Sequence, residues 1–168
     1  FFLTEPYVEY LLSKSGFAII GKEYFMEDHS IFYSAIRNSD VIAVELPPNL
    51  YQQNKDLFLN FINSHKNMIT SYNHQLNQVE SPVYLFGAHV FAQFLIQMGL
   101  DVTKIVSILD NDENKQGKRL YGSNLSVESP KILKNVKDPV VILKAGVYND
   151  EIIDDILNNI NRNSIFWE

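Results

Sequence analysis

The sequence predicts an α/β protein whose C-terminal half forms a doubly wound parallel sheet. Three short apolar runs, at residues 83–86, 105–109 and 140–143, have the length and composition of strands buried in such a sheet. Helical patterns separate them, and alternating strands and helices are typical of parallel strands joined by right-handed crossovers. Ligands of these sheets bind beyond the carboxyl ends of the strands, so we expect a site near Gly87 and Asp110.

The composition is that of an acidic globular chain. Of its 168 residues, 46% are hydrophobic and 20% are charged, and the net charge is -6. This balance argues against a general nucleic-acid or anionic-membrane surface, and no run approaches the roughly 18 apolar residues of a membrane span. The chain has no cysteine, which excludes disulfides and thiolate zinc sites. We expect a cytoplasmic protein that binds neither nucleic acid nor membrane.

The N-terminal segment predicts one helix and a β-hairpin. Thr4 can cap a helix that Gly16 ends, and two aromatic and β-branched runs at residues 17–25 and 29–37 follow as strands. A segment of this size buries too little surface to be stable alone, so we expect it to pack on a partner. The chain begins at Phe1 without a methionine, and we expect it to be part of a longer protein. The stripe predicted to be buried on the helix comprises Tyr7, Val8, Leu11 and Leu12.

A long helix is predicted to link the two halves. Residues 40–46 form an extended run that Pro47 and Pro48 break, and residues 49–80 contain neither proline nor glycine. Apolar side chains recur there at helical spacing, which predicts a helix of about thirty residues, roughly 45 Å long. His65 lies on the apolar stripe and is read as a partly buried helix residue, whereas His74 lies off it and is expected in solvent.

The C-terminal half completes the α/β pattern. After the strand at 83–86, a helix runs from Phe91 to Met98, and Gly99 ends it. Further strands are predicted at 105–109, 125–127, 140–143 and 164–167. A short helix begins at Ser129 and Pro130, and a longer one is capped by Asn149.

The turn after the predicted strand at 83–86 matches the dinucleotide-binding motif poorly but could bind an anion. Gly87, His89 and Ala92 stand where that motif needs three glycines, and His89 carries a side chain into the space for the pyrophosphate. Asp110 does occupy the place of a ribose-binding acid, yet NAD and FAD are disfavoured. The following helix has no acid from Ala88 to Gly99, so its N-terminus can receive an anion.

The loop that starts at Asp110 is better suited to phosphate than to calcium. Its oxygen side chains have a calcium-loop spacing, but Lys115 replaces the required glycine and Tyr121 the required glutamate. Lys115, Lys118 and Arg119 place three cations just past a strand end, where they could clamp phosphate. A solvated turn with charges of both signs is the alternative. No P-loop, nucleophile elbow or metal-ligating histidine pair is present, so we assign no catalytic and no metal-binding residue.

Several of these motifs together resemble the C-terminal domain of the sugar C-methyltransferases. The similarity lies in Gly87-Ala88, the ILDND run at 108–112, KQGKRLYG at 115–122, Ser129-Pro130, and Tyr148 with residues 150–152. The resemblance implies a transferase with a zinc-binding N-terminal domain, a central S-adenosylmethionine-binding domain and a Rossmann-like C-terminal domain. Such proteins methylate a carbon of a nucleotide-linked keto sugar in deoxysugar biosynthesis.

This family plan implies a division of the chain into three parts. Residues 1–46 would be the end of a class I S-adenosylmethionine methyltransferase domain, 47–80 the linking helix, and 81–168 the Rossmann-like domain. The cofactor and catalytic motifs would precede Phe1, so the fragment would bind no cofactor, would not be catalytic alone, and would need its N-terminal methyltransferase domain as partner. The chain departs from many relatives at 87–92, where they have more glycine, and at 145–149, where they have a Trp-Asn pair.

The leading hypothesis is that this domain helps to bind a nucleotide-linked sugar. The cations would contact phosphate, Gly87 to His89 would offer backbone donors, and Asp110 or Asn111 would contact a hydroxyl. His29 could face the active-site cleft, although a simple strand-end role is preferred. Two alternatives remain: a scaffold or dimerisation domain that binds no small molecule, and a free-standing nucleotide-binding module. The predicted substrate-binding residues are Gly87, Ala88, His89, Asp110, Asn111, Lys115, Lys118, Arg119 and Tyr148.

Overall fold

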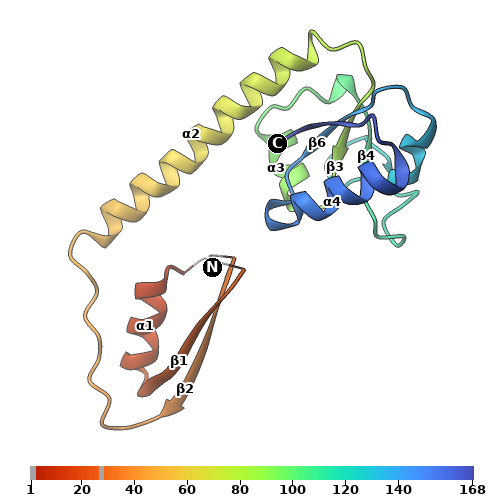
Figure 1. Ribbon diagram of the computed structural model, residues 1–168. Helices are drawn as coiled ribbons and strands as arrows, with labels where there is room; N and C mark the ends of the chain where they lie inside the picture. The colour runs from red at the N-terminus through yellow and green to blue at the C-terminus, as the bar shows by residue number, and fades with distance from the viewer. Residues whose placement is uncertain (1–2, 27–28) are drawn as a thin grey trace. The chain divides into compact units, whose positions relative to one another are not determined.

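The computed structural model describes residues 3–26 and 29–168 and divides the chain into two compact units (Figure 1). The first spans Phe1–Asn60 and the second Phe61–Glu168, so the boundary falls within the long helix α2. Across the described residues, every helix is too short or too polar to cross a membrane.

The first unit contains the predicted helix and hairpin. Helix α1 (Glu5–Lys14) precedes strands β1 (Phe17–Phe25) and β2 (Ser30–Arg37), which pair antiparallel. Thr4 occupies the N-cap position without a side-chain hydrogen bond, and Gly16 adopts φ +77° where the chain leaves the helix. His29, predicted to begin the second strand, lies one residue before it, and the turn residues Glu27 and Asp28 lie outside the described residues.

This unit buries little apolar surface of its own. The Lys22 ammonium forms ion pairs with Glu5 and Glu9 and so ties α1 to β1. Tyr7, Val8 and Leu12 are half-buried, whereas Leu11 is 44% exposed, so the predicted buried stripe is correct only in part. Two strands are too narrow to cover a helix face. The exposed apolar residues of the hairpin include Phe17, Ile19, Ile20, Tyr24, Phe25, Phe32 and Ile36.

Residues 40–46, predicted as an extended run, form no strand within the described part of the chain. The Val44 backbone N–H instead donates to the Ser13 hydroxyl at 2.9 Å. The apolar character of this run therefore does not lead to sheet pairing, because a strand requires a neighbour with matching backbone groups.

Helix α2 (Leu50–Leu76) is confirmed, although it ends four residues before the predicted limit. Its C-terminal turns are buried, with Ile69, Tyr72 and Leu76 at most 3% exposed. The Tyr72 ring stacks on that of Trp167, with ring centroids 6.3 Å apart and planes inclined by 16°. The end of α2 thus belongs to the core of the second unit. His65 is half-buried and His74 is exposed, as predicted.

The second unit is built on a five-stranded parallel sheet, which confirms the predicted fold class. The strand order is β5-β4-β3-β6-β7, and every pairing is parallel. The chain leaves central β3 toward β4 and leaves neighbouring β6 toward β7, so the winding reverses between β3 and β6. In such sheets a crevice for ligands lies at this reversal, beyond the strand ends. The strands are β3 (Val83–Phe86), β4 (Ile105–Leu109), β5 (Val127–Glu128), β6 (Val140–Leu143) and β7 (Ile165–Trp167).

Helical segments cover both faces of this sheet. Alternate side chains of β3 explain the two layers: Leu85 packs with α2 and α3 (Val90–Gln97), and Tyr84 packs on the opposite face with Leu133 and Ile156. On that second face, α4 (Asn149–Asp155) lies across the sheet (Figure 1). The remaining segments are the 3₁₀ helices η1 (Val102–Lys104), η2 (Pro130–Asn135) and η3 (Gly146–Tyr148), and the π-helical turn η4 (Ile156–Ile160).

Two local predictions need correction. Asn149 is the first residue of α4 and not its cap, because its side-chain oxygen accepts a hydrogen bond from the Ala145 N–H at 2.9 Å. The strand predicted at 125–127 begins at Val127, since the Leu125 carbonyl accepts from the Leu120 N–H at 3.0 Å in a turn.

Candidate functional site

The turn after β3 is shaped by Gly87. Its φ of +99° is a conformation that residues with a side chain rarely adopt, and its N–H donates to the Leu109 carbonyl at 2.7 Å. A Cβ atom here would lie 2.2 Å from the Nε2 atom of His89. Glycine is therefore required both by the backbone conformation and by the close approach of the imidazole.

His89 caps the N-terminus of α3 with its imidazole. Its Nδ1 atom accepts a hydrogen bond from the Phe91 N–H at 3.2 Å, so the neutral ring carries its proton on Nε2. Burial and the positive charge of Lys115 lower the pKa of His89, against the opposing effect of Asp110. Because Nδ1 acts as an acceptor, protonation of the ring would also remove the hydrogen bond that caps α3.

Asp110, which is only 7% exposed, connects the loops after β3 and β4. Its Oδ2 atom accepts from the Ala88 N–H at 2.7 Å and from the Lys115 ammonium at 3.0 Å, and its Oδ1 atom accepts from the Asp112 N–H at 2.9 Å. Burial alone would raise the pKa of Asp110, but these hydrogen bonds outweigh burial and hold it below its ordinary value. We refer to Ala88, His89, Asp110 and Lys115 as the Asp110 cluster.

The other predicted residues lie around this cluster. Lys118 and Arg119 are exposed, and the Arg119 guanidinium has a long hydrogen bond of 3.4 Å to Asn124. Asn111 is exposed and lines two shallow polar pockets of 470 and 380 Å³, one of them beside Asp155 and Lys131 and the other beside Glu151. Tyr148 is 44% exposed at the N-cap of α4.

Lys144, at the end of a third strand, is not among the predicted site residues. Lys144 directly follows β6 and lines a pocket of 140 Å³ together with Gly146, His65 and three residues of α3. The predicted strand at 140–143 carried the signal, because its carboxyl end lies beside that of β3.

The described residues contain no group of three or more histidine or acidic side chains placed to hold a metal ion. The N–H groups of Gly87, Ala88 and His89 are already bonded to the Leu109 carbonyl, the Asp110 carboxylate and the Gly87 carbonyl, so the predicted role of these groups as donors to a ligand is wrong in this conformation. Exposed cations lie in the loop after β4, and a mostly apolar pocket lies after β6. Within the described residues, this arrangement contains no nucleophile paired with a base.

A family model described as the C-methyltransferase C-terminal domain matches residues 42–166. The match covers all of α2 and reaches into β7. A comparison with curated proteins finds no significant match.

Proposed function

Because the chain belongs to the C-methyltransferase C-terminal domain family, we propose that it helps an S-adenosylmethionine-dependent enzyme to hold a nucleotide-linked sugar. Membership agrees with the resemblance derived from the strand-end motifs. The chain itself would supply binding and orientation, while the cofactor would be bound by a methyltransferase domain elsewhere in the parent protein.

The observation that carries this proposal is that the Asp110 carboxylate joins the loop after β3 to the loop after β4. Its carboxylate holds the Ala88 N–H and the Lys115 ammonium at 2.7 and 3.0 Å, at the sheet edge where doubly wound domains bind ligands. A ligand that meets a loop already held in place loses less conformational entropy on binding. The cluster thus favours a preorganised site.

The charges suggest how a diphosphate would be held. Lys115 is already paired with Asp110, so its positive charge is largely compensated. The exposed Lys118 and Arg119 lie in the same loop and have no carboxylate partner among the described residues. We assign the phosphate contacts chiefly to these two residues, and hydroxyl contacts to Asn111 and Tyr148.

We assign residues 1–46 to the end of the methyltransferase domain, 47–80 to the linking helix and 81–168 to the Rossmann-like domain. The apolar side chains exposed on the hairpin, among them Phe25 and Phe32, support this assignment, because a strand pair of this kind is stable only against a larger core. The methyltransferase domain that we propose as partner would provide that core.

A second candidate function is that of a scaffold that binds no small molecule. The Asp110–Lys115 pair favours it, since a carboxylate and an ammonium that satisfy each other can simply stabilise a loop. The two functions differ in what they predict for Lys118 and Arg119, which contribute little to the fold.

Titration calorimetry of the chain with a panel of nucleotide-linked sugars tests the proposal. We expect saturable binding that Lys118→Ala/Arg119→Ala weakens at least about tenfold, because each lost charge-assisted hydrogen bond costs roughly 1.5–3 kcal/mol. The matched control is Lys134→Ala/Lys137→Ala, two exposed lysines on the segment that leads into β6. No binding in the chain and in the full-length protein would favour the scaffold, whereas saturable binding that neither double variant alters would remove the phosphate role of Lys118 and Arg119.

A further inference from the structure

A pocket is lined by one face of α3 and by the turn that carries Tyr121. On α3, most of the lining residues follow the i, i+3, i+4, i+7 spacing of a single helix face. The volume of 330 Å³ is at the lower end of the roughly 300–1,000 Å³ that small-molecule pockets occupy. We call this feature the α3 pocket. Its lining residues are Val90, Gln93, Phe94, Ile96, Gln97, Tyr121 and Gly122.

Tyr121 stands on a hydrogen-bonded turn that holds its ring away from the core. The Leu120 N–H donates to the Leu125 carbonyl at 3.0 Å, and the Ser123 N–H donates to the Leu120 carbonyl at 3.1 Å. Leu120 is buried and anchors the turn, whereas the next residue, Tyr121, is 86% exposed. Because the backbone of this turn is already fixed, a ligand that covers the Tyr121 ring loses less conformational entropy on binding.

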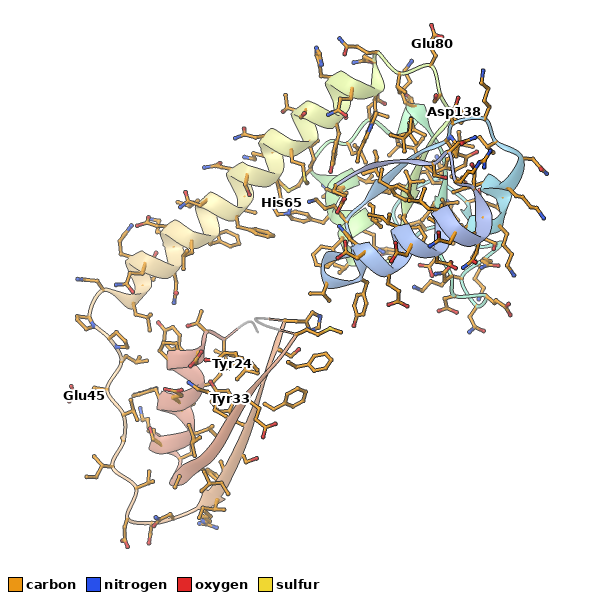
Figure 2. The ribbon with its side chains drawn as sticks, in the orientation of Figure 1. Tyr24, Tyr33, Glu45, His65, Glu80 and Asp138 are labelled. Atoms are coloured by element: carbon orange, nitrogen blue, oxygen red, sulfur yellow. The ribbon has the colours of Figure 1, made fainter. Side chains whose placement is uncertain are left out.

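Phe94 provides a second ring on the helix side of the pocket. His65 projects from α2 toward α3 (Figure 2), and its ring contacts that of Phe94 with centroids 5.3 Å apart. The Phe61 ring lies 6.0 Å from the same phenylalanine ring. Val90, at the start of α3, is 66% exposed. The α3 pocket therefore presents adjoining apolar side chains that are partly uncovered, and such patches mark binding sites.

Two glutamines one helical turn apart supply the polar groups of the pocket. Gln93 is half-buried and Gln97 is exposed, and neither side-chain amide has a hydrogen bond with a residue that the structure describes. Each amide carries one acceptor oxygen and two N–H donors. A hydroxyl group also donates and accepts, so a ligand with several hydroxyls can use both functions of each amide.

None of the described residues that line the α3 pocket is charged. A phosphate or carboxylate would lose hydration here without gaining a counter-charge, which is unfavourable. A wholly apolar ligand would cover the half-buried Gln93 amide without bonding to it. The lining therefore favours a neutral ligand that has both an apolar face and several hydroxyls.

A pyranose ring combines these two properties. The C–H groups on one face are weakly positive and pack on the negative face of an aromatic ring, while the hydroxyls lie around the rim. A cavity of roughly 150 Å³ holds one benzene molecule. The volume of 330 Å³ thus leaves room for one six-membered ring with its hydroxyl groups.

We propose that the α3 pocket binds a neutral pyranose sugar, with the C–H face of the sugar on the Tyr121 ring and its hydroxyls hydrogen-bonded to Gln93 and Gln97. This inference goes beyond the proposed function, because the pocket offers no charge to the diphosphate of a nucleotide-linked sugar. It stands whether or not such a ligand binds at Lys118 and Arg119.

Nuclear magnetic resonance titration of the isotope-labelled chain with a panel of neutral methyl hexopyranosides and deoxyhexopyranosides tests this inference. At least one glycoside should shift the side-chain amide resonances of Gln93 and Gln97 saturably, whereas glycerol, which has hydroxyls but no ring face, should not. Tyr121→Ala should weaken this binding at least about threefold and Gln93→Leu/Gln97→Leu at least about tenfold. Tyr121→Phe should retain it. Tyr51→Ala, which removes an exposed ring from α2, is the matched control.

Three results would overturn the inference: no saturable shift with any glycoside of the panel, binding that Tyr121→Ala leaves unchanged, or equal shifts with glycerol. Shifts of the same amide resonances when the chain is concentrated without sugar would also overturn it and would assign the pocket to a contact between two copies. Glycoside binding that survives Lys118→Ala/Arg119→Ala, in a protein that binds no nucleotide-linked sugar, would retain the inference and remove the proposed function.

Discussion

The Asp110 carboxylate accepts a hydrogen bond from the Ala88 N–H at 2.7 Å, across 22 positions of sequence. This bond joins the loop after β3 to the loop after β4, at the carboxyl edge of the sheet. Because the carboxylate also accepts from Asp112 and Lys115, its loss would leave several donors without a partner.

Asp110→Asn should therefore lower the free energy of unfolding by about 1–3 kcal/mol, since an amide offers one acceptor where the carboxylate offers two and carries no charge for Lys115. Urea denaturation measures this loss. Glu113→Gln, which removes an exposed carboxylate from the same loop, is the matched control and should change stability by less than about 0.5 kcal/mol. An equal effect of both substitutions would show that Asp110 does not fasten the loops.

The stabilisation by Asp110 should depend on pH in the acid range. Its pKa in the folded protein lies below the ordinary value of 3.8, so the unfolded chain takes up the proton first as the pH falls. The contribution is fully present above 3.8 and is lost as the pH falls from there through the folded pKa. The difference in unfolding free energy between His89→Gln and His89→Gln/Asp110→Asn, a pair in which His89 does not titrate, should be constant from neutral pH to about 5 and shrink below that. A difference that grows on acidification would contradict this.

His89 should titrate below its ordinary pKa of 6.5, and Lys115→Met should raise its midpoint, because burial and the Lys115 charge both disfavour the imidazolium. Asp110→Asn should lower the midpoint further. Nuclear magnetic resonance of the imidazole protons, assigned with His89→Gln, measures these shifts. As the folded pKa is depressed, the His89 contribution to stability is present above 6.5 and declines as the pH falls. Shifts of the same sign in both variants would contradict the arrangement.

Gly87→Ala should destabilise the protein by about 1–3 kcal/mol, because φ is strained and the new methyl group collides with the His89 ring. Gly117→Ala provides the matched control: its φ is +73°, and nothing lies within 4 Å of the added Cβ. The excess cost of Gly87→Ala over Gly117→Ala, measured by thermal denaturation, isolates the collision. Equal costs would show that His89 does not occupy this position.

Tyr72→Phe and Tyr72→Ala should affect stability in very different ways. The buried Tyr72 hydroxyl has no hydrogen-bond partner among the described residues, and burial raises the pKa of Tyr72 to about 12. Removal of the hydroxyl should leave stability unchanged or raise it by up to about 1 kcal/mol, whereas loss of the ring should cost about 3–5 kcal/mol. A substantial loss in Tyr72→Phe would reveal a bonded hydroxyl. Urea denaturation measures both.

The three longest strands of the parallel sheet could be predicted to the residue. Residues 83–86 and 140–143 are continuous apolar runs that are fully buried, and 105–109 is apolar apart from Ser107, with only Val106 exposed. The short β5 was misplaced because Leu125 takes part in a turn that depends on Leu120. Apolar pattern cannot distinguish a two-residue strand from the turn before it.

The candidate site was harder to predict because its contacts depend on distances across loops. The βαβ pattern predicts that Gly87 and Asp110 follow neighbouring strands. It does not predict the hydrogen bond that the Ala88 N–H donates to the Asp110 carboxylate. The pairing of Lys115 with Asp110 depends on how a five-residue turn folds, and the sequence shows only a lysine in a charged loop. The binding roles of these residues stay predictions.

The stack of Trp167 on Tyr72 gives the protein a built-in optical reporter. Trp167 is the one indole in the chain, and it lies in the unit that spans Phe61–Glu168. The fluorescence emission of Trp167 should therefore change when that unit unfolds and should not change when the hairpin unfolds, whereas far-ultraviolet circular dichroism registers both units. Fluorescence and circular dichroism, recorded on one unmodified sample, should separate the unfolding of the two units.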